Sequence, residues 1–194
     1  MLFEVLQVIA LQVEDYLDKD VTLGNIALLD ESNNGAIEDA ILLTLINMSE
    51  ENTMKNFKNI RTVGNVTQVK QPVINLNLYI MFSVNRGVGS YDEELADLSA
   101  IVTFFQGKKV FTQSNSIYNH STNEMNPLSS LDNFKFHVEL YTPTFEEQSY
   151  IWGSLGGKQR PSAVYKVSVI QIESEEVQSQ GGIITETDQT INQL

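Results

Sequence analysis

The sequence predicts an α+β domain: a single mixed, largely antiparallel sheet with about three helices packed on it and long inter-strand loops. Two observations support this prediction. Three segments carry apolar residues at helical spacing, and five or six segments show the two-residue alternation or the short apolar runs of strands. With 194 residues, 42% of them apolar, the chain is long enough for one well-packed core. Strands joined partly by hairpin-like and partly by helix-spanned connections are typical of this fold class.

The first half of the chain is predicted to begin with a helix and to continue with strands. Apolar residues from Leu2 to Val13 repeat at the spacing of one helix face, which predicts a helix over residues 2–17. Strands are predicted at residues 21–29 with a break at Gly24-Asn25, at residues 41–48, and at residues 73–84, where the alternation is clearest. The polar residues 51–72 are expected to form a long connection.

Two more helices are predicted in the second half, each from a capping box, in which Ser or Thr is followed three residues later by Glu. Ser90 opens the first of them, over residues 91–106. Thr144 opens the second, which is expected to end at Gly156 and Gly157, because glycine often ends helices.

Further strands are predicted at residues 110–111, 134–140 and 163–172, with a loop at residues 112–133. We expect the domain to span residues 1–172. The remaining residues, 173–194, are acidic and rich in Gln, Thr and Ser, which predicts a mobile C-terminal extension with a short strand at Ile183-Ile184.

The net charge of −13 is unevenly distributed: −10 on residues 1–54, +2 on residues 55–172 and −5 on residues 173–194. An acidic chain does not favour binding to nucleic acid or to an anionic membrane. Neither a signal peptide nor a transmembrane segment is predicted, so we expect the protein to be made and kept in the cytoplasm. A slightly basic centre between acidic ends could pair head-to-tail with other copies, although a solvated acidic surface explains the same charges.

No catalytic residue, metal site or cofactor is predicted. His120 lies in a polar loop, and His137 lies on the polar face of a strand with no further ligands at metal-site spacing. The glycine-rich segment 153–158 has the wrong spacing for a phosphate loop, and it follows the end of a helix, where the dipole repels phosphate.

Residues 151–162 are unusual, because they hold the only tryptophan and two of the basic residues of the central segment. A core tryptophan, a glycine helix stop and a strand start account for this pattern. The alternative is an assembly interface, since Trp and Arg are favoured binding anchors. The candidate interface residues are Trp152, Gly156, Gly157, Lys158 and Arg160.

The block Trp152-x-x-Leu155-Gly156-Gly157-Lys158-x-Arg160-Pro161-Ser162-x-Val164-Tyr165-Lys166-Val167 is the most specific part of a wider similarity over roughly residues 2–172. Shorter matching runs lie at Phe3–Leu6, Val21–Ala27 and Leu43–Glu51. In these residues the sequence resembles the tail-terminator (cap) proteins of phage-tail-like contractile injection systems of the antifeeding-prophage and virulence-cassette type.

The resemblance implies a non-enzymatic structural protein that needs no cofactor. Such a protein forms a ring with copies of itself, expected to be a homo-hexamer. The ring caps the baseplate-distal end of the inner tube and contractile sheath and terminates their polymerisation. It would assemble in the cytoplasm, within a particle that is released from the cell or attached to its envelope. Two alternatives stay open: a small acidic hydrolase using loop carboxylates, and a sheath-assembly chaperone absent from the finished particle.

Overall fold

The computed structural model describes eight segments of the chain: residues 2–28, 40–51, 59–63, 66–70, 74–86, 90–116, 134–172 and 177–182. Their helices are α1 (Leu2–Leu17), α2 (Tyr91–Gly107) and α3 (Phe145–Ser154), with a 3-10 turn, η1, at Ile26–Leu28. Their strands are β1 (Val21–Leu23), β2 (Ala40–Glu50), β3 (Asn59–Val63), β4 (Val66–Lys70), β5 (Ile74–Asn85), β6 (Val110–Thr112), β7 (Lys135–Tyr141), β8 (Ser162–Ile172) and β9 (Val177–Gly182). The chain divides into two compact units, a larger one of Met1–Glu50 with Leu76–Ile170 and a smaller one of Glu51–Asn75 with Gln171–Leu194.

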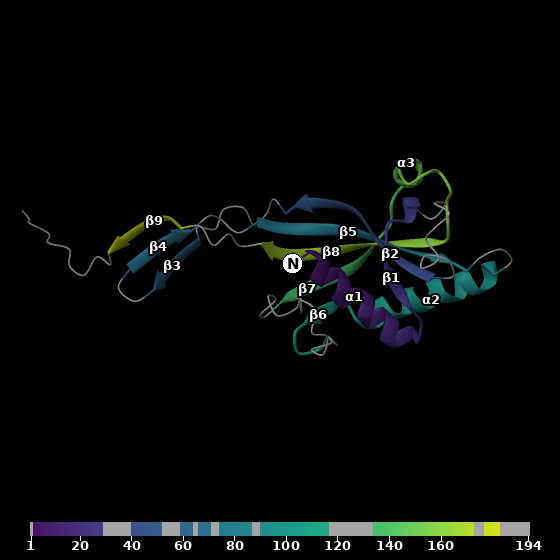
Figure 1. Cartoon of the computed structure of the whole chain (residues 1–194), viewed down its shortest axis with the longest axis horizontal. Helices are drawn as coiled ribbons and strands as arrows, with labels where there is room; N and C mark the ends of the chain where they lie inside the picture. The colour runs from purple at the N-terminus through teal and green to yellow at the C-terminus, as the bar shows by residue number, and fades with distance from the viewer. Residues whose placement is uncertain are drawn as a thin grey trace, which may run out of the picture. The chain divides into compact units, whose positions relative to one another are not determined.

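The larger unit contains a six-stranded sheet with the strand order β1-β2-β5-β8-β7-β6 (Figure 1). β1 runs parallel to β2, whereas the pairs β2–β5, β7–β8 and β6–β7 are antiparallel. The predicted α+β class, with three helices and a mixed, largely antiparallel sheet, is therefore confirmed.

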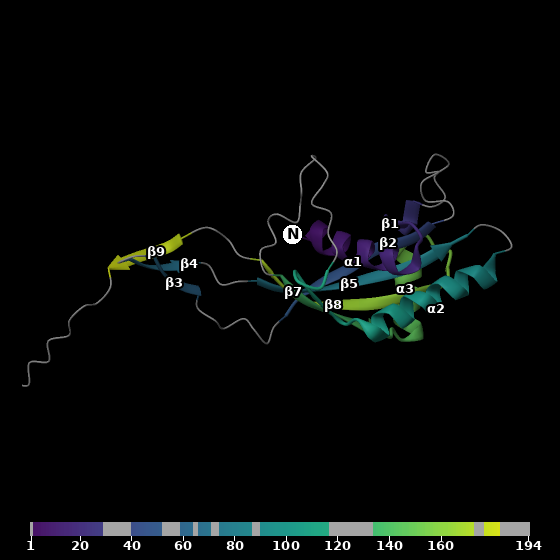
Figure 2. The same ribbon diagram turned by 90° about the horizontal axis from the view of Figure 1, so that it is seen from below.

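Helices cover both faces of this sheet, with α1 and α2 on one face and α3 on the other (Figures 1 and 2). The first half of β2 is consequently buried on both sides: Ile41, Leu42 and Leu43 are each at most 1% exposed. A strand covered on both faces has no polar side, so its sequence is a continuous apolar run. This explains the apolar run Ile41–Leu43, whereas the second half of β2 is more exposed.

The larger core lies between the sheet and helices α1 and α2. Three rings meet near its centre: Phe82 of β5, Phe105 of α2 and Tyr165 of β8, with centroid separations of 4.4 to 5.9 Å. Burial raises the pKa of Tyr165 to about 12, so its hydroxyl stays protonated. The stripe that α1 presents to this core consists of Val5, Val8, Ile9 and Val13.

A smaller core lies on the opposite face, under α3. Trp152 is 5% exposed there, so it is a core residue. It packs with residues of η1, β2, β5 and β8, namely Ile26, Ala40, Leu42, Met81 and Val164. None of the helices in the described segments is long and apolar enough to cross a membrane.

A buried carboxylate joins three elements of the larger unit. Asp97 of α2 accepts hydrogen bonds from Lys19 Nζ at 2.5 Å and from Arg86 Nε at 2.9 Å. Arg86 follows β5, and its main-chain N–H donates to the carboxylate of Glu94 at 3.0 Å. The side chain of Asp97 is 5% exposed, that of Arg86 14% and that of Lys19 45%, so the Arg86–Asp97 pair is the largely desolvated one.

The smaller unit contains a three-stranded antiparallel sheet with the order β3-β4-β9. Here the structure differs from the prediction. Residues 51–72 are expected to form a long connection, but they contain the β3–β4 hairpin. Both strands are rich in β-branched residues, and Gly64-Asn65 between them is the kind of two-residue sequence that connects hairpins.

The third strand of this sheet, residues 177–182, was not predicted. It lies within the segment that is expected to be a mobile extension. The domain boundary at residue 172 and the mobility of the extension stay predictions. The strand predicted at Ile183-Ile184 lies outside the described residues, and so do most of the predicted loop at residues 112–133 and His120.

The three predicted helices are confirmed, but only one of the two predicted capping boxes forms. Thr144 Oγ1 accepts from the N–H of Glu147 at 3.2 Å, and the Glu147 carboxylate accepts from the N–H of Thr144 at 2.8 Å. These hydrogen bonds from Thr144 lower the pKa of Glu147, because they favour its charged form. The box at Ser90 is wrong: Ser90 precedes α2 with φ −108° and makes no side-chain capping bond.

The carboxylate of Asp97 is expected to contribute strongly to folding. Asp97→Asn leaves the guanidinium of Arg86 largely buried without a full counter-charge, which should cost about 3 kcal/mol of unfolding free energy. Lys19→Ala removes the more exposed partner and should cost less than about 1 kcal/mol. Urea unfolding of both variants measures the difference. Equal losses for the two variants would show that burial does not decide the strength of this network.

The two helix starts give a matched pair of variants. Thr144→Ala should cost about 1 kcal/mol of unfolding free energy, because it removes a cap that is formed, whereas Ser90→Ala should cost at most a few tenths.

The lowered pKa of Glu147 means that the contribution of this carboxylate to stability is present above its unfolded pKa, near 4.5, and is lost as pH falls through the folded value. Thermal melts between pH 3 and pH 7 should therefore show a weaker loss of stability at acid pH in Glu147→Gln. An equal loss of stability at acid pH in Glu147→Gln and in the unsubstituted protein would contradict this.

Candidate assembly surface

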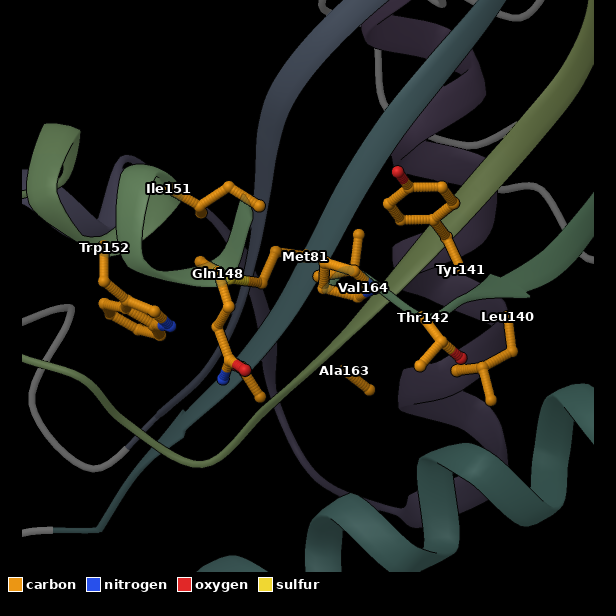
Figure 3. Close-up of a pocket in the computed structure, with 11 residues that line it drawn as sticks. Met81, Leu140, Tyr141, Thr142, Gln148, Ile151, Trp152, Ala163 and Val164 are labelled. Atoms are coloured by element: carbon orange, nitrogen blue, oxygen red, sulfur yellow. The ribbon is translucent and has the colours of Figure 1, made fainter. Parts of the chain in front are cut away.

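A pocket of about 230 Å³ lies beside Trp152, between α3 and the strands β5, β7 and β8 (Figure 3). Its apolar lining comes from Met81, Leu140, Ile151, Trp152, Ala163 and Val164, and its polar lining from Thr142, Gln148 and Ser162. Gln148, Ile151 and Trp152 belong to α3, and Leu140 lies on the other side, on β7. The pocket is thus lined by both apolar and polar groups.

Tyr141 is the only ionisable residue among those that line this pocket. Its ring lies edge-on to Tyr79 with the centroids 5.2 Å apart, and its hydroxyl donates to Glu147 at 3.4 Å. Desolvation, with a smaller effect of the Glu147 charge, raises the pKa of Tyr141. A hydrolase that uses carboxylates needs two of them with perturbed pKa values in one cleft, and this pocket offers none.

Large apolar side chains of α3 and β7 are exposed to solvent. Phe145, at the first position of α3, is 93% exposed, Tyr150 is 69% exposed and Leu140 is 57% exposed. Phe145 stands seven residues before Trp152 and therefore lies on the same helix face, two turns earlier. The side chain of Trp152 packs against the sheet, whereas that of Phe145 does not. Exposed apolar side chains grouped in this way mark interaction sites.

The loop after α3 is shaped by two glycines in the left-handed region. Gly156 has φ 99° and Gly157 has φ 79°, and nothing lies within 4 Å of a Cβ built on either, so conformation and not space requires glycine here. The Gly157 N–H donates to the Trp152 carbonyl at 2.7 Å, the long-range bond of a Schellman helix stop. The loop then reaches the sheet, where the Pro161 carbonyl accepts from the Val84 N–H at 3.2 Å.

Two cations project from this loop. Lys158 is exposed and Arg160 is half-buried. Within the described residues the guanidinium of Arg160 has no carboxylate within ion-pair distance. We call the pocket, the exposed residues Leu140, Phe145 and Tyr150, and the loop with Lys158 and Arg160 the α3 surface.

The structure separates the five predicted interface residues by role. Trp152 faces the sheet and forms a wall of the pocket, Gly156 and Gly157 stop the helix, and Lys158 and Arg160 carry the positive charges of the loop. Sequence reasoning missed the exposed apolar residues of the surface. One signal was available for them: α3 holds three aromatic residues in ten positions, more than a single contact with a sheet can bury.

His137 is half-buried on β7. Among the described residues no group of three or more His, Asp or Glu side chains is placed to hold a metal ion.

Comparison with known proteins relates the chain to terminator proteins. Its sequence matches the family of the Pvc16 N-terminal domain over residues 4–186. No match was found among curated protein sequences. Among solved structures, it is similar to the PVC sheath/tube terminator of an extracellular contractile injection system in the extended state, with a TM-score of 0.65 and 12% identity. It is also similar to the tube-terminating cap of the anti-feeding prophage, with a TM-score of 0.57 and 14% identity.

The structural agreement covers 100% and 98% of this chain but only 64% and 62% of those two proteins, so the chain spans less than two thirds of their length. At these identities the agreement establishes a common fold. The family match covers most of the chain, and the two structures with the same fold are terminator proteins, in agreement with the resemblance seen in the sequence block around Trp152. The chain therefore belongs to the Pvc16 N-terminal domain family.

Proposed function

We propose that this chain is the terminator of a phage-tail-like contractile injection system. It forms a homo-hexameric ring that caps the baseplate-distal end of the inner tube and sheath and ends their polymerisation. The observation that carries the proposal is the agreement in fold with a sheath/tube terminator over the whole chain. The uncovered α3 surface supports it, because an apolar surface with a cationic rim fits a structural contact better than a catalytic cleft.

The distribution of charge supports head-to-tail contacts within the ring. Asp15, Asp18 and Asp20 are exposed around the C-terminal end of α1, on the face of the sheet opposite to α3. Lys158 and Arg160 lie on the α3 side. A closed ring needs two different, complementary patches on each copy, and these opposite charges on opposite faces provide them. In this arrangement the α3 surface of one copy faces the end of α1 of the next.

The other partners in the proposal are the sheath and the inner tube. The ring assembles in the cytoplasm and becomes part of a particle that is released from the cell or held at its envelope. The protein acts without a cofactor and without catalysis.

Particle composition and length test this function. Mass spectrometry of purified particles should find the chain in about six copies per particle, and particles made without it should vary in length under the electron microscope. A chain required for assembly but absent from the finished particle would overturn the cap and support a chaperone. Uniform particles without the chain would overturn both, as would hydrolytic activity that depends on its carboxylates.

Reversing the charge of Arg160 should disrupt assembly without affecting the fold. Arg160→Glu places like charges against the neighbouring acidic patch, and loss of such a pair weakens association by about 2–5 kcal/mol. Light scattering at several concentrations and particle lengths measure the effect, and thermal melts check the fold. Lys109→Glu is the matched control, since Lys109 is exposed in the connection between α2 and β6. Normal particles with Arg160→Glu would remove the loop from the interface.

Two aromatic residues on one face of α3 separate scaffold from interface. Trp152→Ala should cost about 3–5 kcal/mol of unfolding free energy, because it empties the smaller core. Phe145→Ala should change stability by less than about 0.5 kcal/mol, because none of the described residues covers this ring, which is 93% exposed, yet it should weaken ring association at least tenfold. Denaturant unfolding of both variants measures the loss of stability, and light scattering measures ring association. A strongly destabilised Phe145→Ala, or one that assembles normally, would contradict this division.

A further inference from the structure

The small sheet β3-β4-β9 has two open edges. Its central strand β4 pairs with β3 from Val63↔Val66 to Asn59↔Lys70 and with β9 from Val66↔Gly182 to Lys70↔Val177. Among the described residues no further strand pairs with the outer side of β3 or of β9. Each edge therefore presents a row of main-chain N–H and C=O groups that can form hydrogen bonds with another strand.

A sheet of this size gains little stability by itself. Its strands have five or six residues, and no helix of the described segments belongs to the smaller unit. Ile60 is 55% exposed and Val66 38% exposed, so even the apolar side chains of this sheet are incompletely covered. Short sheets of this kind need more strands or a packing partner to be stable.

The edge at β9 lacks the usual protection against pairing with other chains. Edge strands commonly carry lysines, other charges or prolines that prevent such pairing. The sequence Val177-Gln178-Ser179-Gln180-Gly181-Gly182 has neither a charge nor a proline, and β3 has one charged residue, Arg61. Both edges are thus open to another strand.

The strand directions decide which edges can meet in a ring. β3 and β9 both run antiparallel to β4, so they run parallel to each other. A rotation about an axis near the strand direction preserves that direction and brings β9 of one copy beside β3 of the next. A two-fold axis would instead join β9 to β9 and leave both β3 edges open, so only the rotation uses every edge.

We propose that β9 of each copy pairs in parallel with β3 of the next copy, so that the small sheets of all copies close into one β-barrel with three strands per copy. This inference rests on the ring of the proposed function and assigns it a second interface besides the α3 surface. Closure removes all edges. With six copies the barrel has about 18 strands, a size at which barrels enclose an aqueous channel.

Cysteine cross-linking of the chain tests this pairing without interference, because the chain has no native cysteine. Arg61→Cys is combined in turn with Gln178→Cys, Ser179→Cys and Gln180→Cys, which covers both faces and the neighbouring registers. Arg61 and Gln180 both pair with Gln68, so they are two strand spacings, roughly 9–10 Å, apart within one copy. A disulfide needs Cα atoms within about 7 Å and therefore has to join two copies.

The expected result is a ladder of covalent oligomers that ends at the size of the ring for at least one double variant, and no cross-link for any single variant. Thr62→Cys with Thr67→Cys is the matched control, since these residues face each other within one copy and should form an intramolecular disulfide. The variants are oxidised at high protein concentration and after addition to sheath–tube particles that lack their cap.

Dimers formed by the single variants would show that like edges meet and would overturn the barrel. A ring seen by light scattering or on particles, with no cross-link in any double variant, would overturn the barrel while leaving the proposed function intact. If the chain forms no ring under either condition, the proposed function fails together with the barrel.

Discussion

The antiparallel pair β2–β5 lies inside the larger sheet, between β1 and β8, and because its residues contribute to the apolar cores on both faces, both faces have to be covered. Two long helices cover one face. On the other face, the ten residues of α3 cover only part of the area, over the smaller core. The pocket lies beside this cover, between α3 and the strands β5, β7 and β8. The α3 surface is thus a direct result of an incomplete second layer, which a neighbouring molecule can complete.

Elements that pack within the larger unit could be predicted well, because burial against one sheet places apolar residues at regular spacing in the sequence. β9 could not be predicted, because it is polar and pairs with residues that are distant in the chain, whereas the β-branched residues of β3 and β4 carry a local signal for the hairpin. The two capping boxes show the limit of local patterns. Ser90 and Thr144 begin the same motif, yet only Thr144 forms the box.

The candidate surface was predictable in its charges and not in its apolar part. Lys158 and Arg160 stand in a distinctive block, and basic residues in a loop are expected to be exposed. Leu140 continues the apolar alternation of β7, which predicts burial, yet it is 57% exposed. Whether such a side chain is covered depends on how far the elements packed on the sheet extend over it. That extent follows from tertiary packing and is not written in the residues around Leu140.

The discontinuous make-up of the small sheet has a consequence for the order of folding. β3 and β4 are neighbours in the chain and can form their hairpin locally, within microseconds. β9 pairs with β4 across a long separation, since Val69 and Ser179 lie about 110 residues apart, and closing such a loop is slow. Along the chain, β5 follows β4, and β9 follows β8. Because β5 and β8 are neighbours in the larger sheet, formation of that sheet brings β9 close to β4. Until then β4 keeps a free edge, on which the β9 of another chain could settle as a domain swap.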